Sequence, residues 1–173
     1  MKPTPSPPRL KNYMYVRDRR DDGVEWIRAE RIDPETLERP VCVVNGVFDI
    51  LHSGHMKLLF HAREHCKTLI VAMNSDRMVR DLKGPSRPVL NWIERATALG
   101  YTPIDLLCEF DSETELRDLL NRVRPDFRVQ GGEYKDQHTK YPWLQKLYVR
   151  SDGMRTSEII RRIQKSYEST KTN

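Results

Sequence analysis

Two histidines three residues apart are the side chains in this sequence best suited to chemistry. His52 and His55 stand at the end of the segment NGVFDILHSGH, residues 45–55, with Gly54 between them. On an opening helical turn, residues three apart point to the same side, and a glycine puts no side chain between a bound group and the backbone. Amides at the start of a helix favour negative charge. Together these features predict a site for a polyphosphate.

The histidines also admit plainer interpretations. His52 and His55 could be a surface pair or two zinc ligands, but no third ligand follows at a suitable spacing. His61 and His65, four apart on the following helix, are interpreted as surface or packing residues. We therefore predict no metal site built from protein ligands.

The motif joins a predicted strand to a predicted helix. It follows the apolar run VCVV at 41–44, and residues 56–63 have helical apolar spacing. Open α/β sheets bind their ligands at the carboxyl ends of strands, which is where this junction lies. Further strands are predicted at 68–73, 104–110, 127–130 and 147–149.

Helices are predicted between and after these strands. One spans 91–99 and another 112–123, and each opens with a capping-box pattern. A last helix begins at Thr156 or Ser157, with an inner face of Ile159, Ile160, Ile163 and Tyr167. Alternating strands and helices imply a mostly parallel sheet. The predicted fold class is α/β, with a Rossmann-like, doubly wound, mostly parallel five-stranded sheet.

The chain divides at about residue 40. Residues 1–40 are predicted to be an N-terminal extension, and its first twelve residues or so are proline-rich and expected to be disordered. Residues 13–40 mix apolar positions with many charges, which leaves a short helix and an edge strand equally open. Residues 41–170 are predicted to form the main domain.

Composition excludes several classes of protein. The net charge of +5 fits a nucleic-acid binder, an anionic substrate or merely a basic surface, but the first forty residues hold nine Lys/Arg against eight Asp/Glu and form no basic arm. Nucleic acid is therefore a disfavoured partner. The apolar runs are too short to cross a membrane, and prolines occupy the place of a signal-peptide core. Three cysteines without a spacing pattern favour a reducing compartment, so we expect a cytoplasmic protein with no membrane partner.

The segment GVFDILHSGH resembles the G-x-F-D-x-x-H-x-G-H signature of the cytidylyltransferase-like nucleotidyltransferases. The resemblance covers residues 40–168 and is strongest to the heptose-1-phosphate adenylyltransferase domain of ADP-heptose synthase, with glycerol-3-phosphate cytidylyltransferase next. It rests on an ordered set of motifs: VNGVFD at 44–49, VAMNSD at 71–76, LKGPSRP at 82–88, Glu94-Arg95, GGEY at 131–134 and TSEII at 156–160. A G-x-G-x-x-G fingerprint and a Walker loop are both absent from the sequence, which disfavours a dehydrogenase and a P-loop kinase.

The resemblance implies in-line attack by a phosphorylated small molecule on the α-phosphorus of an NTP, with release of pyrophosphate. The catalytic residues it implies are His52, His55 and Lys83. The nucleotide-binding residues it implies are Gly46, Val47, Phe48, Gly54, Arg95, Arg150, Ser151, Thr156 and Ser157. The substrate-binding residues would be Asp49, Gly131, Gly132 and Glu133, although Asp49 or Asn45 could instead hold the shape of the loop. Mg²⁺ would be carried by phosphate oxygens and water, without a protein cage.

Two positions depart from the pattern of the resembled enzymes. Arg155 precedes Thr156-Ser157 where those enzymes have a serine, and Gln130 replaces a lysine before the double glycine. The expected acceptor is a phosphorylated sugar or polyol, with ATP favoured over CTP, and a homodimer is possible. A catalytically idle homologue, with residues 1–40 as its interface, is the alternative that the two departures keep open.

Overall fold

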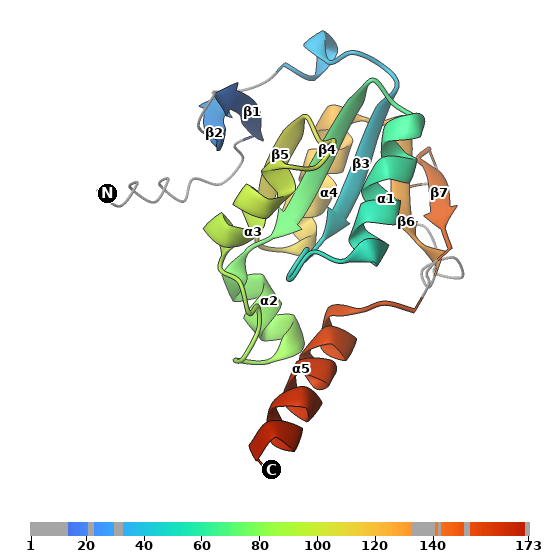
Figure 1. Ribbon diagram of the computed structural model, residues 1–173. Coiled ribbons are helices and arrows are strands. Elements are labelled where there is room, and N and C mark those ends of the chain that lie inside the picture. The colour runs from blue at the N-terminus through green and yellow to red at the C-terminus, as the bar shows by residue number, and fades with distance from the viewer. Residues whose placement is uncertain are drawn as a thin grey trace.

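The computed structural model describes residues 14–20, 23–29, 33–132, 141, 143–150 and 153–171, with side chains described from residue 33 onward. Its centre is a seven-stranded sheet in the order β2-β1-β5-β4-β3-β6-β7 (Figure 1). Five strands are mutually parallel, which confirms the predicted α/β architecture. They are β3 (Val41–Gly46), β4 (Thr68–Asn74), β5 (Leu106–Phe110), β6 (Phe127–Gly131) and β7 (Gln145–Val149).

The undecided segment after residue 13 forms a β-hairpin at one edge of this sheet. Strands β1 (Met14–Arg20) and β2 (Gly23–Ala29) pair antiparallel, with Met14 opposite Ala29. β1 also pairs antiparallel with β5, with Met14 opposite Cys108. Part of the predicted extension is therefore hydrogen-bonded to the sheet, while the division at residue 40 stays a prediction. The first twelve residues lie outside the described part of the chain.

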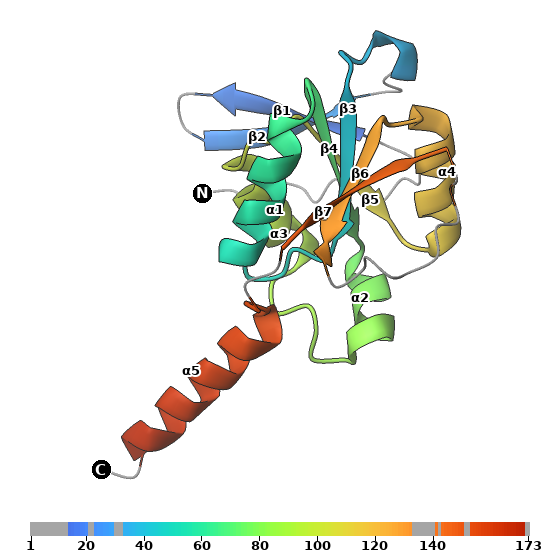
Figure 2. The same cartoon turned by 90° about the vertical axis from the view of Figure 1, so that its right-hand side faces the viewer.

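Helices cover both faces of the sheet, as Figure 2 shows. α1 (Ser53–Glu64) and α3 (Trp92–Gly100) lie on one face, and α4 (Glu113–Val123) lies on the other. The predicted helices are confirmed at 92–100 and 113–123, where Asn91 and Ser112 act as N-caps. A short 3₁₀ helix, η1 (Pro34–Thr36), precedes β3. An additional helix, α2 (Asp76–Lys83), was not predicted; Ser75 caps it by accepting a hydrogen bond from the amide of Met78.

The core consists of two apolar layers, one on each face of the sheet. Every residue of β4 is buried, as expected for a parallel strand that is covered on both sides. Val43 faces Leu120 and its neighbours on the α4 side, while Val44 faces Leu59 of α1 on the opposite side. Burying each such aliphatic side chain stabilises the fold by about 1.5–3 kcal/mol. The core therefore fixes the strand ends that carry the site.

The strand order reverses direction between β3 and β6. From β3, the chain order runs outward through β4 to β5 on one side and through β6 to β7 on the other. In open α/β sheets a ligand binds beyond the carboxyl ends of the strands at such a switch point. The loop that carries the histidine motif leaves β3 at this place (Figure 1).

The last helix, α5 (Thr156–Lys171), begins at this edge and runs away from the body of the molecule (Figures 1 and 2). Its residues Ile163 and Tyr167 are 59% and 62% exposed. The prediction that they lie on an inner face is therefore wrong, because amphipathic spacing does not say whether another element covers the face. In the described part of the chain, no helix has the length and apolar character needed to cross a membrane.

Candidate active site

The two histidines of the motif stack on one another at the start of α1. Their ring centroids are 3.9 Å apart with an interplanar angle of 28°. His52 is the N-cap of α1, and its Nδ1 accepts a hydrogen bond of 3.1 Å from the amide of Gly54. A neutral His52 ring therefore carries its proton on Nε2, where it can be donated to a ligand. The predicted proximity of His52 and His55 is confirmed.

Gly54 is required by the packing of this turn. A Cβ atom at position 54 would lie 3.0 Å from Cε1 of the His52 ring and 3.3 Å from the carbonyl oxygen of Met154. A side chain here would push the histidine away from its capping position, and it would separate the loop from the segment that leads into α5. The glycine thus serves close approach of protein segments as well as the open backbone predicted from the sequence.

The loop after β3 has a strained backbone. Phe48 and Ile50 adopt φ angles of 52° and 50°, a left-handed conformation that costs non-glycine residues about 1–3 kcal/mol each. The Phe48 ring is 1% exposed and belongs to the core, with its centroid 5.2 Å from that of His55. The side chain of Phe48 therefore packs against His55 from the core and is not exposed to a ligand.

Asp49 holds the loop in shape. Its carboxylate is 1% exposed and accepts hydrogen bonds from Arg87 Nε at 2.8 Å and from the amides of Val89 and Leu90 at 2.9 and 3.0 Å. Both carboxylate oxygens are thus engaged by the segment after α2. This geometry supports the structural alternative for Asp49 over the substrate-binding one. Arg87, which was not among the predicted site residues, is the partner that compensates the buried charge.

Arg95 is placed differently from the prediction. The resemblance implied a contact with phosphate, but the side chain is fully buried. Its guanidinium donates to the carbonyl oxygen of Val47, to that of Asn74 at 2.9 Å and to Asp76 Oδ1 at 2.7 Å. Arg95 therefore ties the loop after β3 to the end of β4 and to α2. Its role in this structure is to position the loop from behind.

The start of α5 meets the histidine loop. Thr156 Oγ1 donates a hydrogen bond of 2.7 Å to the carbonyl oxygen of Asp49. Ser157, in the first turn of the helix, is exposed. Segments more than one hundred residues apart in sequence are thereby joined at the carboxyl edge of the sheet. The first turns of α1 and α5 lie at the same edge.

Comparison with known proteins decides the family. A sequence model described as cytidylyltransferase-like matches residues 43–167, a span that includes the histidine motif and the start of α5. The chain belongs to the cytidylyltransferase-like family. This match agrees with the nucleotidyltransferase resemblance that the sequence motifs carry.

Curated relatives are similar in sequence over most of the chain. The bifunctional protein HldE of Syntrophotalea carbinolica is 41% identical over 138 residues, covering 75% of this chain and 28% of the relative. HldE of Shigella sonnei is 37% identical over 174 residues, covering 93% of this chain and 36% of the relative. The chain thus spans about a third of the length of these relatives.

Solved structures share the fold at low sequence identity. A lipopolysaccharide core biosynthesis protein from Thermoplasma volcanium superposes with a TM-score of 0.50 and 20% identity, covering 66% of this chain and 98% of that one. A pantoate-β-alanine ligase from Francisella tularensis, in complex with an ATP analogue and β-alanine, gives a TM-score of 0.50 and 13% identity, with coverages of 70% and 63%. These likenesses support the Rossmann-like fold of the cytidylyltransferase-like domain.

Electrostatics keep His55 neutral in the free protein. Burial, and next the neighbouring His52, lower its pKa from the ordinary 6.5 to about 4, while the Asp49 carboxylate opposes this shift. His55 Nδ1 is buried and has no hydrogen-bond partner among the residues that the structure describes. An anion bound here would raise the pKa of His55, because it would stabilise the charged ring.

The remaining predicted site residues lie around the same edge of the sheet. Lys83 is the exposed last residue of α2. A Cβ atom at Gly132 would lie 3.3 Å from the carbonyl oxygen of Val149, so the ends of β6 and β7 approach closely there. Arg150 follows β7 and is exposed. The predicted residues Glu133 and Ser151 fall outside the described part of the chain.

Arg155 adds positive charge beside the helix start. It lines an open hollow of about 620 Å³ together with Ser157 and residues of the first turns of α5. Arg161 and Arg162 also line this hollow, but both bind Glu158, at 2.7 and 2.8 Å. Their hydrogen bonds lower the pKa of Glu158 to about 2. Arg155 is exposed, so it is the cation of this hollow best placed to meet a phosphate.

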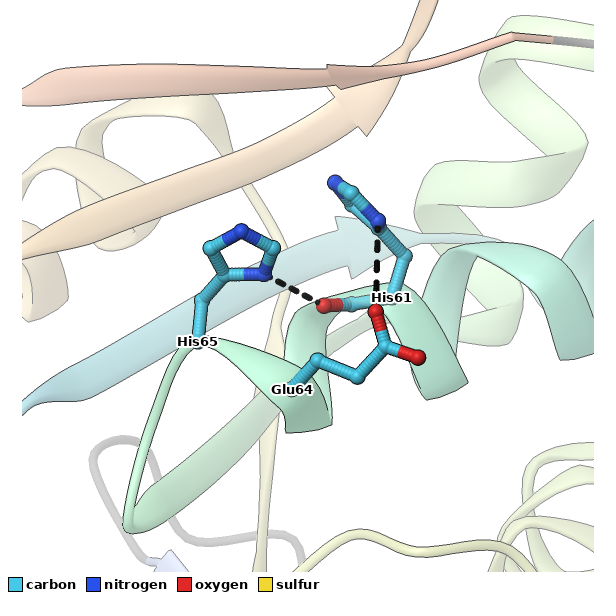
Figure 3. Close-up of side chains that lie close together, drawn as sticks. All are labelled: His61, Glu64 and His65. Atoms are coloured by element: carbon cyan, nitrogen blue, oxygen red, sulfur yellow. Dashed lines mark hydrogen bonds and ion pairs between the residues drawn. The ribbon is translucent and has the colours of Figure 1, made fainter.

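A second histidine cluster lies at the far end of α1, about 18 Å along the helix from His52. His61, Glu64 and His65 bring one ligand atom each within 4.8 Å of one another (Figure 3). His65 Nδ1 is 2.8 Å from the carbonyl oxygen of His61, and His61 Nδ1 is 3.9 Å from Glu64 Oε2. Imidazole ligands suit transition metals and not Mg²⁺. This cluster is separate from the nucleotidyltransferase site.

Proposed function

We propose that this protein transfers a nucleoside monophosphate from an NTP to a phosphorylated sugar or polyol and releases pyrophosphate. The observation that carries the proposal is the stacked pair His52 and His55, held at a helix start at the switch point of the sheet. The named relatives, HldE proteins at 37–41% identity, support an acceptor of the sugar-phosphate class. ATP is proposed over CTP on the resemblance of the sequence motifs alone.

The residues act mainly by positioning and by neutralising charge. A phosphate oxygen of the acceptor attacks the α-phosphorus in line, and negative charge grows on the bridging oxygen to pyrophosphate as that bond breaks. His52 donates from Nε2 to this developing charge. His55, neutral in the free protein, gains a proton more readily once a polyanion lies beside it, and it then donates as well. No covalent intermediate with the protein is required.

Other residues would bind the departing pyrophosphate and the nucleotide. The helix-start amides at Ser157, the Arg155 guanidinium and Lys83 are proposed to contact the β- and γ-phosphates. The backbone of 46–48 is proposed to face the α-phosphate and ribose. Mg²⁺ would neutralise the triphosphate through phosphate oxygens and water, because Asp49 and Asp76 are already bound by Arg87 and Arg95.

Pyrophosphate release is the direct test. The protein is incubated with ATP or CTP, Mg²⁺ and a panel of phosphorylated acceptors that includes a heptose 1-phosphate and glycerol 3-phosphate. The proposal predicts acceptor-dependent release of pyrophosphate, which His52→Ala slows by about 100-fold or more. If the wild-type protein binds no NTP and His52→Ala changes nothing, the enzyme function is wrong, and the alternative of a catalytically idle binding component takes its place.

The β1–β2 hairpin offers a surface on which an idle binding component could contact a partner. It extends the sheet beyond β5 and leaves β2 as an outer strand, and an outer strand presents unpaired backbone groups to another chain. A homodimer is proposed as the assembly, and light scattering of the purified protein measures its mass. Partners of the active protein are the NTP and the phosphorylated acceptor, and we expect it to act in the cytoplasm.

A further inference from the structure

An arginine crosses the switch point from β6 to β3. Arg128 donates hydrogen bonds from Nε and Nη2 to Asn45 Oδ1, at 3.0 and 2.8 Å. Asn45 is the penultimate residue of β3, directly before the glycine that opens the histidine loop. Arg128 shares the α4 face of the sheet with Val43, its partner in the strand register. The guanidinium is therefore held where the strand order reverses, which is the ligand-binding crevice of such sheets.

This guanidinium differs from the other arginines near the site. Arg87 and Arg95 each bind an aspartate, at 2.8 and 2.7 Å. Among the described residues, the hydrogen bonds of Arg128 go to the neutral Asn45 alone, and its Nη1 makes none. Burial lowers the pKa of Arg128 from its usual value. Tyr141 and the Glu113 carboxylate oppose this shift in the pKa of Arg128, but neither is bound to the guanidinium by a hydrogen bond or salt bridge among the described residues. A partly buried charge without a directly bound counter-ion is unfavourable, and the planar fork of an arginine matches a phosphate.

A buried acceptor lies on the same strand as Arg128. Gln130 is two residues further along β6, so its side chain emerges on the same face as that of Arg128. Gln130 Oε1 is buried and has no hydrogen-bond partner among the residues that the structure describes. A hydroxyl group could satisfy this oxygen, whereas a phosphate oxygen would be repelled by it. A cation for a phosphate and an acceptor for a hydroxyl together match a phosphorylated sugar or polyol.

We propose that Arg128 and Gln130 form the acceptor subsite, with Arg128 binding the acceptor's phosphate and Gln130 accepting a hydrogen bond from one of its hydroxyls. This inference rests on the proposed function and extends it. The acceptor then enters on the α4 side of the crevice, while the histidines act from the α1 side. Asn45 is a positioning residue, because it holds the guanidinium at the end of β3.

The test separates acceptor binding from nucleotide binding and from folding. Arg128→Met keeps the length of the side chain and removes its charge. We expect KM for the acceptor to rise about tenfold or more, as for loss of a charge-assisted hydrogen bond, while KM for the NTP changes less than about twofold. We also expect Tm to stay close to that of the wild type, because removing a partly buried charge offsets the loss of the hydrogen bonds to Asn45 Oδ1. Arg122→Met, an exposed arginine on α4, is the matched control.

The possible outcomes are distinct. An unchanged acceptor KM in an active Arg128→Met enzyme overturns the inference and leaves the proposed function intact. A lowered Tm with both KM values raised assigns Arg128 a structural role and also overturns it. If no acceptor of the panel is turned over, sulfate decides: at matched ionic strength it should raise Tm of the wild type and Arg122→Met more than that of Arg128→Met. An equal rise in all three proteins contradicts the subsite.

Discussion

The loop after β3 is held by side chains from three other segments, whereas the end of β6 carries polar groups with few partners. Arg87 binds Asp49, Arg95 binds the Val47 carbonyl, and Thr156 binds the Asp49 carbonyl. On the other side of the switch point, Arg128 has one neutral partner and Gln130 Oε1 has none in the described structure. The loop after β3 is therefore fixed by the protein itself, whereas the polar groups at the end of β6 can still bind a ligand.

This contrast has a physical basis. Groups that stabilise a transition state must be oriented before the reaction, because reorientation during the step would cost free energy. Groups that recognise a substrate gain most when the substrate supplies the missing charge or hydrogen bond. The histidine loop fits the first description and the end of β6 fits the second. Both lie at the carboxyl edge of one sheet, so they can act on the same phosphates.

The largest effect is expected from the histidine loop itself. His52→Ala removes a donor aimed at the developing charge, and kcat should fall by about 100- to 1000-fold. Steady-state pyrophosphate release measures this loss. His61→Ala, on the same helix, is the control and should stay within about twofold of the wild type. A His52→Ala enzyme with nearly normal kcat would show that the stacked pair is not the catalytic centre.

The contacts that hold the loop after β3 should also contribute strongly to the unfolding free energy. Arg95→Met leaves Asp76 and two backbone carbonyls without their donor, and breaking such a buried pair costs about 3–5 kcal/mol of unfolding free energy. Urea denaturation measures this, with Arg161→Met on the exposed face of α5 as the control. If Arg95→Met is as stable as Arg128→Met, the two sides of the switch point do not differ as described.

The pH dependence of stability isolates His55. Its pKa is about 4 in the folded protein and 6.5 in the unfolded chain, so between these values the unfolded state binds more protons. Stability should therefore be full above pH 6.5 and decrease as the pH falls toward 4, by about 2–4 kcal/mol from this group. Denaturation at pH 7 and pH 4.5 measures the loss, and His55→Asn should reduce it. An identical loss in wild type and variant would exclude His55 as its source.

A smaller effect is expected where α5 joins the loop. Thr156→Val removes the hydroxyl that donates to the Asp49 carbonyl, and it should cost about 1 kcal/mol of stability. NTP affinity should fall several-fold, because the helix start loses its fixed place beside the histidines, while acceptor KM is unchanged. Thr170→Val, at the exposed end of α5, is the matched control. Equal NTP affinity in the two variants would break the link between α5 and nucleotide binding.

Local patterns in the sequence were sufficient to predict much of the fold. The buried strands β3 and β4 contain continuous apolar runs, β5 is mostly apolar, and the capping residues Asn91 and Ser112 mark their helices. The motif of His52 and His55 is also local, since three-residue spacing on a helix decides which side chains meet. Such features need no knowledge of distant partners, and the structure confirms them.

Features that depend on distant partners were missed or misjudged. The hairpin of β1 and β2 reads as a charged mixture, and it becomes sheet only by pairing with β5. Arg95 looks like a solvated or phosphate-binding cation until Asp76 and the Val47 carbonyl surround it. Ile163 suggested a covered helix face, but α5 extends away from the body. A signal for Arg128 did exist, since an arginine in a strand of the central sheet is partly buried and requires a partner.

The central claim of the proposed function is that the α-phosphate of the NTP moves to the acceptor as part of a nucleoside monophosphate. An NTP that carries a radiolabel at its α-phosphate is incubated with the protein, Mg²⁺ and the phosphorylated acceptors, and the products are separated by charge. The proposed function predicts that the label moves to a nucleotide–sugar or nucleotide–polyol product with the wild-type protein and stays in the NTP with His52→Ala. Label that stays in the NTP with the wild type, across ATP, CTP and all acceptors, would contradict it.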